Sequence, residues 1–209
     1  MIFESIAVGP LSVNCYVIAC EQSREGIVVD PGGDAPLIVD LVRKHALKIN
    51  TIINTHGHFD HVGGNKQLLA ACGARLMIHE ADAPMLHRAV DVGLMYGMKS
   101  ENSPEADAYL EDGMEIAFGA YILKVLHTPG HTRGGCCLYV EREHLVITGD
   151  TLFADSIGRT DLPGGSHEQI LESIRTKLFT LPDDVIAYPG HGEQTTIGHE
   201  KLHNPYFDH

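Results

Sequence analysis

The sequence lacks a long hydrophobic run and a recognisable export signal. No apolar segment approaches the ~20 residues that a membrane-spanning helix requires. Residues 1–5 contain no basic region, and no hydrophobic stretch ending at a small-residue cleavage site follows them. We therefore expect a cytoplasmic protein that does not interact with membranes.

Basic clusters and paired cysteines are also missing. The formal net charge of -13 repels phosphate backbones, and no group of Lys or Arg residues offsets it locally, so nucleic acid is not an expected partner. The cysteines are odd in number and lack C-x-x-C spacing, which argues against a disulfide framework and a structural zinc knuckle. We predict reduced, small core residues at Cys15, Cys20, Cys72, Cys136 and Cys137.

The length and the periodicity of the chain predict one layered domain. With 209 residues, 44% hydrophobic and 21% charged, we predict a single domain over residues 1–209. Strands are predicted at residues 2–8, 14–19, 26–30, 49–53, 74–79, 114–117, 121–127, 135–140, 145–148 and 185–188. Helices are predicted from the N-cap Asp34 to Leu47, at 65–71, 83–95 and 167–178, and after Thr195, with a mobile loop at 97–108. Strands followed by helices in both halves predict two sheets packed face to face, a four-layer αββα sandwich of the α/β (α+β) class.

One short stretch, residues 55–64, concentrates side chains that bind metals. His56, His58 and His61 lie with Asp60 directly after an apolar run that is typical of a buried strand. Histidine and aspartate each account for 14 of the 209 residues, so the spacing H-x-H-x-D-H has a chance expectation of roughly 0.4%. In an extended segment His56 and His58 project to the same side and can bind one ion. Asp60 and His61, in the turn into a helix, diverge toward another.

Three further candidate ligands follow predicted strands. They are His131, Asp150 and His191, and the glycine before each allows backbone shapes that a side chain would forbid. Layered α/β proteins commonly place their sites at the carboxyl ends of strands. The complete set has seven N and O ligands and no thiolate, which suits Zn, Mn or Fe.

These motifs resemble those of the metallo-β-lactamase-fold hydrolases, most closely the short glyoxalase-II-like (hydroxyacylglutathione hydrolase-like) enzymes. The resemblance covers essentially the whole chain, through residues 55–64, 130–132, 149–153, 158–161 and 189–192. It implies an αββα sandwich with two divalent metal ions, of which Zn is the first expectation, at the edge between the sheets. The ligands that it implies are His56, His58 and His131 for the first ion, Asp60, His61 and His191 for the second, and Asp150 as the bridge.

The expected chemistry is hydrolysis by a metal-bridging hydroxide. Two adjacent dications lower the pKa of a shared water toward ~7, so no Ser or Cys nucleophile is required. The hydroxide can attack a polarised carbonyl, and Asp60 can move the residual proton, which makes Asp60 and the bridging Asp150 the predicted catalytic residues. No other strong acid is evident in the motifs, and a thiolate leaves with less acid assistance than an amide nitrogen, which favours a thioester.

Arg159 is the predicted substrate-binding residue, because it follows Gly158 in a loop shortly after the bridging ligand. In glyoxalase II a basic residue in the matching place contacts the glutathione part of the substrate, and a guanidinium can hold a carboxylate with two hydrogen bonds. An internal ion pair with Asp161 or Asp155 is the alternative. Asp161 stands where glyoxalase II has a substrate-contacting Tyr, and the C-terminal helical extension of the full-length enzyme is missing. The expected substrate is therefore S-lactoylglutathione or a thioester of a different thiol.

Other functions on this fold stay open at this stage. A persulfide dioxygenase with one iron held by His56, His131 and Asp150 is the main alternative, and another ester or lactone hydrolase, a nuclease and a non-catalytic metal-binding protein are further ones. We expect a monomer or a small homo-oligomer that takes a small-molecule thioester. The remaining histidines fit no ligand position and are predicted to have surface or structural roles: His45, His79, His87, His127, His144, His167, His199, His203 and His209.

Overall fold

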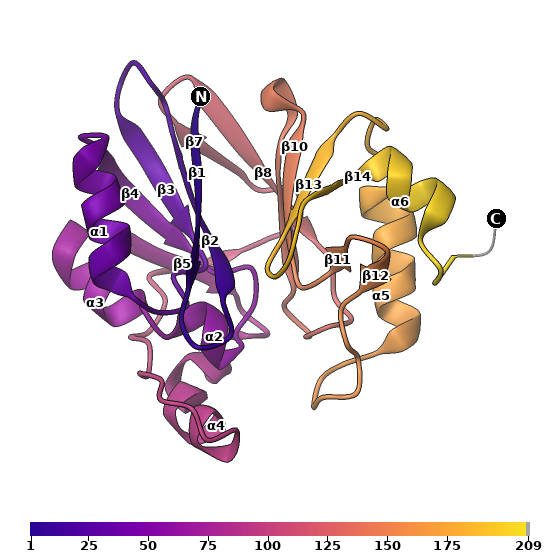
Figure 1. The fold of residues 1–209 in the computed structure, drawn as a ribbon, viewed down its shortest axis with the longest axis horizontal. Helices are drawn as coiled ribbons and strands as arrows, with labels where there is room; N and C mark the ends of the chain where they lie inside the picture. The colour runs from indigo at the N-terminus through magenta and orange to yellow at the C-terminus, as the bar shows by residue number, and fades with distance from the viewer. Residues whose placement is uncertain (208–209) are drawn as a thin grey trace. The chain divides into compact units, whose positions relative to one another are not determined.

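The computed structural model describes residues 1–207 and forms two compact units. Unit 1 comprises Met1–Leu110 with Ala117–Tyr121, and unit 2 comprises Glu111–Ile116 with the residues from Ile122 onward. Each unit contains a six-stranded mixed sheet with helices packed on it (Figure 1). The single domain over residues 1–209 stays a prediction. Within residues 1–207, no helix combines the length and the apolar character needed to cross a bilayer.

Unit 1 is built on a sheet with the strand order β1-β2-β3-β4-β5-β6. Its strands are β1 (Ile2–Val8), β2 (Val13–Ala19), β3 (Glu25–Val29), β4 (Lys48–Ile53), β5 (Arg75–His79) and β6 (Ala108–Leu110). The first three pair antiparallel, and β3 to β6 pair parallel. Parallel neighbours need a crossover connection. The crossovers contain α1 (Ala35–Lys44), then α2 (Phe59–Val62) and α3 (Asn65–Cys72), then η1 (Ala83–Arg88) and α4 (Ala89–Met95).

The crossover helices of unit 1 bury apolar side chains against the sheet. Ile38 of α1 and Leu68 of α3 are fully buried in one cluster with Val28, Ile52 and Leu76 from the strands. Burying a side chain of this size contributes roughly 1.5–3 kcal/mol. This packing fixes the end of β4, from which the predicted metal-binding stretch leaves.

Unit 2 is built on a sheet with the strand order β14-β13-β10-β9-β8-β7. Its strands are β7 (Glu115–Phe118), β8 (Tyr121–His127), β9 (Cys136–Val140), β10 (Leu145–Gly149), β13 (Ile186–Pro189) and β14 (Thr195–Thr196). The tip of the β7–β8 hairpin, residues 117–121, is grouped with unit 1. The turn between β9 and β10 contains η2 (Glu141–Glu143), and the parallel pair of β10 and β13 is joined through a hairpin and a helix. The hairpin consists of β11 (Leu152–Phe153) and β12 (Ser156–Ile157), and the helix is α5 (His167–Ser173) with its π-helical continuation η3 (Ile174–Leu178). A last helix, α6 (Ile197–His203), follows β14.

The core of unit 2 lies between its sheet and these helices. Ile170 of α5, Ile174 of η3 and Ile197 of α6 are fully buried with Val146 of β10 and Ala187 of β13. The packing of α5 and α6 on one face leaves the carboxyl ends of β8, β10 and β13 to carry the loops with the predicted ligands.

Most of the predicted elements are confirmed within one or two residues of their bounds. The strands β6, β11, β12 and β14 were not predicted, because two or three residues are too few to show a period. The helix predicted at 83–95 is a 3-10 segment followed by α4, and the one predicted at 167–178 ends as a π-helical turn. All five cysteines are free thiols, and Cys72 alone among them is half-buried rather than buried.

Asp34 is the N-cap residue of α1, as predicted, but its side chain does not cap the helix. Asp34 precedes α1, yet its backbone is left-handed with a φ of 45°, and its side chain makes no capping hydrogen bond. Its Oδ2 instead accepts a hydrogen bond from the backbone N–H of Gly9 at 2.9 Å. The helix also ends at Lys44 rather than at Leu47, because Ala46 has a left-handed backbone with a φ of 50°.

Candidate metal centre

The first group of predicted ligands lies in unit 1, between β4 and α2. Residues 54–58 form an irregular bend that carries His56 and His58, and Asp60 and His61 lie on α2 itself. Three of these side chains are shielded from water, since Asp60 is 7% exposed and His56 and His61 are at most 1% exposed, whereas His58 is half-buried. Unpaired burial of so many polar groups would be unfavourable, so their partners determine what they can do.

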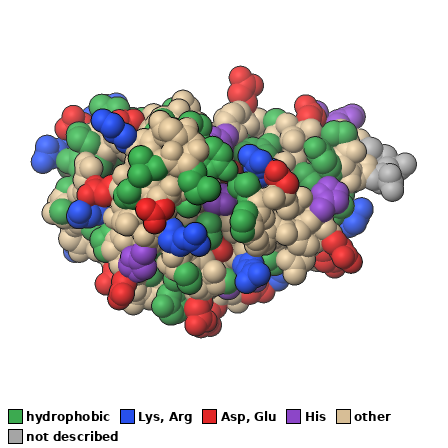
Figure 2. Space-filling model, turned by 90° about the horizontal axis from the view of Figure 1, so that it is seen from below, with side chains coloured by type: hydrophobic (Ala, Val, Ile, Leu, Met, Phe, Trp, Pro, Cys, Tyr) green, Lys and Arg blue, Asp and Glu red, His purple; other side chains and the backbone are tan. Residues whose placement is uncertain are grey.

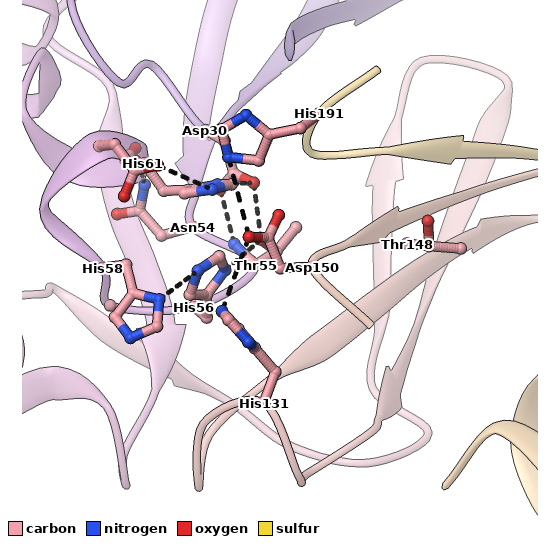
Figure 3. A network of polar contacts seen from close by, with 12 residues as sticks. Asp30, Asn54, Thr55, His56, His58, His61, His131, Thr148, Asp150 and His191 are labelled. Atoms are coloured by element: carbon pink, nitrogen blue, oxygen red, sulfur yellow. Dashed lines mark hydrogen bonds and ion pairs between the residues drawn. The ribbon is translucent and has the colours of Figure 1, made fainter. Parts of the chain in front are cut away.

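The carboxylate of Asp30, directly after β3, organises two of these histidines. Its Oδ2 lies 2.9 Å from Nδ1 of His61 and accepts the hydroxyl proton of Thr55 at 2.6 Å, and its Oδ1 accepts the Thr55 N–H at 2.7 Å (Figure 3). Because the Thr55 hydroxyl donates to Asp30, its Oγ1 can only accept from Nδ1 of His56, 3.1 Å away. Asp30 thus keeps a proton on Nδ1 of both imidazoles, so in their neutral forms Nε2 is the unprotonated nitrogen of each.

The unprotonated nitrogens point at other ligand-type atoms. Nε2 of His56 lies 3.1 Å from Nδ1 of His58, and Nε2 of His61 lies 3.7 Å from Oδ2 of Asp60. Ligand-type atoms of Asp30, His56 and His61 also lie within 4.8 Å of one another. We interpret Asp30 as an outer carboxylate rather than a ligand, because its Oδ2 is occupied by the Nδ1 proton of His61.

Buried amides hold the backbone of this stretch. The side-chain amide of Asn54 donates to the carbonyl of His61 at 3.1 Å, and the amide of Asn65 donates to Oδ1 of Asn54 at 2.7 Å. The same Asn65 amide nitrogen donates to Oγ of Ser103 at 2.9 Å. The network therefore connects the segment 97–108 to the backbone of His61.

Gly57 sits where no side chain fits. A Cβ at this position would lie 2.7 Å from Cβ of Met85 and 2.9 Å from the carbonyl of Asp82. Its N–H donates to Oδ2 of the buried Asp82 at 3.0 Å. The bend between His56 and His58 is thereby fixed on both sides.

The second group of predicted ligands lies in unit 2. Asp150 directly follows β10, His131 lies in the bend after β8, and His191 follows β13. Oδ2 of Asp150 lies 3.6 Å from Nε2 of His131 and 3.8 Å from Nε2 of His191 (Figure 3). Nδ1 of His131 donates to the carbonyl of Arg159 at 2.8 Å, so its Nε2 is the unprotonated nitrogen that faces Asp150.

Arg159 forms the internal ion pair that was the alternative to substrate binding. Its Nε and one terminal nitrogen donate to the two carboxylate oxygens of Asp161 at 2.8 and 2.7 Å. This guanidinium lowers the pKa of Asp161 to about 2. Both side chains are more than half exposed, so a carboxylate of a substrate can compete for the guanidinium. Contact with substrate stays a prediction.

The structure thus brings His56, His58, Asp60 and His61 together in unit 1. It brings His131, Asp150 and His191 together in unit 2. The roles predicted for these residues in metal binding and catalysis stay predictions.

The other histidines include several with carboxylate or carbonyl partners. Such contacts join His45 to Glu4 at 2.8 Å, His127 to the Arg133 carbonyl at 3.1 Å, His144 to Asp184 at 2.7 Å and His199 to Asp155 at 2.8 Å. His209 lies outside the described residues.

Sequence reasoning missed the supporting residues Asp30, Asp82 and Asn65. Asp30 did carry a signal, because it is a carboxylate at the end of an apolar strand next to Pro31 and Gly32. Its left-handed φ of 50° is a strained conformation of the kind that functional sites retain. Asp82 and Asn65 carried no comparable signal, since only the fold brings them to the bend.

Similarity to known proteins extends along the whole chain. The model of the metallo-beta-lactamase superfamily matches residues 8–191. The chain is 34% identical to the hydroxyacylglutathione hydrolase GloC of Haemophilus influenzae, over 100% of this chain and 99% of that protein.

Two solved structures have the same fold. A crystal structure of the BLEG-1 B3 metallo-beta-lactamase has a TM-score of 0.91 and 35% identity, covering 98% of this chain and 99% of that one. The crystal structure of TTHA1623 in a di-iron-bound form has a TM-score of 0.90 and 33% identity, covering 98% of this chain and 100% of that one. The predicted fold class is confirmed: two mixed sheets flanked by helices in the αββα metallo-β-lactamase fold.

Proposed function

The chain belongs to the metallo-β-lactamase superfamily and is a metallo-hydrolase of that fold, and we propose that it hydrolyses thioesters of the hydroxyacylglutathione type. The observation that supports metal-dependent hydrolysis is the orientation of the buried imidazoles. The observation that supports the substrate class is the full-length similarity to a hydroxyacylglutathione hydrolase.

The donor set fits divalent metal ions. His61 and His131 each give their Nδ1 proton to an oxygen acceptor, Asp30 Oδ2 and the Arg159 carbonyl, and turn Nε2 toward a carboxylate. Ligating histidines characteristically have this arrangement, because the outer acceptor fixes the tautomer and raises the basicity of the ligand nitrogen. The 3.1 Å between the ligand nitrogens of His56 and His58 is close to the about 3.3 Å expected for two nitrogens on one tetrahedral ion.

We propose that the seven predicted ligands bind two divalent metal ions. The di-iron form of the relative TTHA1623 supports two ions and makes iron a candidate beside zinc and manganese. When bound, two such ions supply a nucleophilic hydroxide at neutral pH and polarise the substrate carbonyl. Asp60, buried beside Nε2 of His61, would then accept the residual proton on a carboxylate oxygen, and Oδ2 of Asp150 faces Nε2 of both His131 and His191.

A thioester fits this set of residues better than an amide. The leaving thiolate is the conjugate base of a thiol with a pKa near ~8.5 and needs little protonation, whereas an amine must receive a proton as it leaves. Arg159 supplies a guanidinium that can exchange Asp161 for a carboxylate of the thiol part of the substrate. The acid-rich chain does not suit a nuclease, and basic side chains are scattered among acidic and apolar ones on the face shown in Figure 2.

The test is hydrolysis of S-lactoylglutathione by the metal-loaded protein, followed by release of the thiol. The matched control is Asp184→Asn, which removes one exposed carboxylate of unit 2, and the disabled variant is Asp150→Ala. We expect turnover by the wild type and the control and at least 100-fold less by Asp150→Ala. Turnover no higher than that of Asp150→Ala would exclude the proposal.

Two further assays separate the alternatives. A chromogenic β-lactam tests amide hydrolysis, because one similar structure is a B3 metallo-beta-lactamase. Metal analysis combined with oxygen uptake on glutathione persulfide tests the dioxygenase. One iron per chain with oxygen consumption would replace the hydrolase proposal, and absence of oxygen uptake would support it.

A further inference from the structure

A cavity of about 450 Å³ in unit 2 is lined by residues that have no role in the proposed metal centre. Its lining comes from the last residue of β8 and the bend after it, from the loop before α5 and from the first turn of α5. The lining residues are His127, Pro129, Arg133, Gly164, Gly165, Ser166 and Gln169. The volume is within the range of small-molecule sites.

The charge of this lining is opposite to that of the chain. Acidic residues exceed basic ones by 28 to 15 in the sequence, yet the lining contains one guanidinium and no carboxylate. Among the described residues, Arg133 has no ion-pair partner, in contrast to Arg159. An exposed arginine at the wall of a cavity, without a carboxylate beside it, favours an anion.

The two glycines of the lining are closely packed, one of them against Arg133. Gly164 has a φ of 94°, and a Cβ there would lie 3.6 Å from Cγ of Arg133, so the arginine stem runs along the glycine backbone. A Cβ on Gly165 would lie 2.4 Å from the carbonyl of Thr160, and the Gly165 N–H donates to the Leu162 carbonyl at 2.9 Å. The loop before α5 is therefore closely packed, and Gly165 leaves no room for a side chain.

Ser166 adds a hydroxyl donor to the lining. Its N–H donates to the Gly130 carbonyl at 2.7 Å, which ties the loop to the bend before His131. Its Oγ accepts the N–H of Gln169 at 3.3 Å, so the hydroxyl proton can be directed to a ligand. The amide of Gln169 provides a second neutral donor in the lining.

We propose that this cavity binds a small anion, a carboxylate or a phosphate group, on Arg133 with Ser166 and Gln169 as neutral donors. The anion can belong to the substrate, as the carboxylate of its thiol part, or to a separate small molecule. Pro129 and Arg133 lie on either side of His131 in the chain, so a ligand in the cavity contacts the loop that carries this predicted metal ligand. The proposal does not rest on the thioesterase activity.

The direct test is calorimetric titration of the protein with inorganic phosphate. Because phosphate also binds metal centres, each arginine variant is made in the Asp150→Ala background as well as in the wild type. We expect saturable binding at one site in Asp150→Ala and at least 10-fold weaker binding after Arg133→Gln is added. Arg142→Gln, the same charge change on η2 of the same unit, should bind like the parent.

Arg133→Lys is the control that separates weaker binding from impaired folding, since it keeps the positive charge and loses the paired donors of the guanidinium. It should retain an intermediate affinity, and thermal melting should be the same for all three arginine variants. Equal phosphate affinity in the parent and Arg133→Gln, or no saturable binding up to ~10 mM, would overturn the proposal.

The source of the anion is decided by kinetics with S-lactoylglutathione. A KM that rises about 10-fold in Arg133→Gln with an unchanged kcat assigns the cavity to the carboxylate of the substrate. An unchanged KM together with phosphate binding assigns it to a separate anion. If the protein does not hydrolyse this thioester, phosphate binding still decides whether the cavity is an anion site.

Discussion

Nδ1 of His61 lies 2.9 Å from Oδ2 of Asp30, and both side chains are at most 1% exposed. Since the Thr55 hydroxyl donates to the same oxygen at 2.6 Å and accepts from His56, one carboxylate sets the protonation of two predicted ligands. The centre therefore depends on a residue that is not expected to touch the metal.

Asp30→Asn should weaken metal binding. An amide oxygen accepts less strongly than a carboxylate, and the amide group can present a donor to Nδ1, so Nδ1–H is no longer enforced on His61 and His56. We expect a 10- to 100-fold loss in affinity for the metal, the usual effect of removing such an outer partner. Metal affinity is measured by competition with a chromophoric chelator.

The matched control for this variant is Asp40→Asn. Asp40 is an exposed carboxylate of the same unit, 3.8 Å from Arg43, and such a pair contributes little. Equal metal affinity in Asp30→Asn and Asp40→Asn would show that Asp30 does not tune the ligands.

The dependence on Asp30 shows where sequence reasoning reaches its limit. The ligand string was predictable, because chelation demands particular residue types at close spacing after a strand. The long strands and the crossover helices were predictable from their periods. Asp82 and Asn65 were not, because they reach the bend at residues 54–58 only through tertiary packing. The Arg159–Asp161 pair was one of two stated alternatives, and residue types alone could not choose between them.

Removal of the metal should abolish activity and lower stability. A ligand present at 100 times its dissociation constant stabilises the folded state by about 2.7 kcal/mol, which corresponds to several degrees in melting temperature. We expect a chelator to lower the melting temperature by this amount and Zn, Fe or Mn to restore it. Asp150→Ala should respond much less, and an equal shift in both proteins would contradict the assignment of Asp150 as a ligand.

Asp161→Asn should release Arg159 for substrate. The neutral amide no longer competes for the guanidinium, so KM for a carboxylate-bearing thioester should fall. Arg159→Gln should raise KM about 10-fold, since a hydrogen bond to a charged group contributes about 1.5–3 kcal/mol. Thermal melting should hardly change in either variant, because the pair is exposed. Unchanged KM values in both variants would leave Arg159 with the ion-pair role alone.

Gly158→Ala should destabilise unit 2 at the Asp150 loop. A Cβ at Gly158 would lie 1.8 Å from the carbonyl oxygen of Asp150, so the backbone of one of them must move. We expect a loss of about 2–4 kcal/mol in urea unfolding, together with reduced metal content. Gly113→Ala is the control: it has a left-handed φ of 77° and open space, so about 1 kcal/mol is expected. Equal losses of unfolding free energy in Gly158→Ala and Gly113→Ala would contradict a specific effect of the contact with Asp150.

His199 on α6 should titrate above the ordinary range of a histidine. Its Nε2 lies 2.8 Å from Oδ1 of Asp155 and 3.9 Å from Oε1 of Glu200, and the hydrogen bond to Asp155 is the main cause of its raised pKa. The raised pKa means that the ion pair stabilises the fold fully below about pH 6.5, the unfolded value, and that this contribution is lost as the pH rises through the folded pKa. Asp155→Asn should return the pKa of His199 toward its ordinary value in an NMR titration of the ring protons. Asp184→Asn, which removes the partner of His144 instead, should leave the titration of His199 unchanged. A His199 titration that is the same in the wild type and in Asp155→Asn would rule out the ion pair in solution.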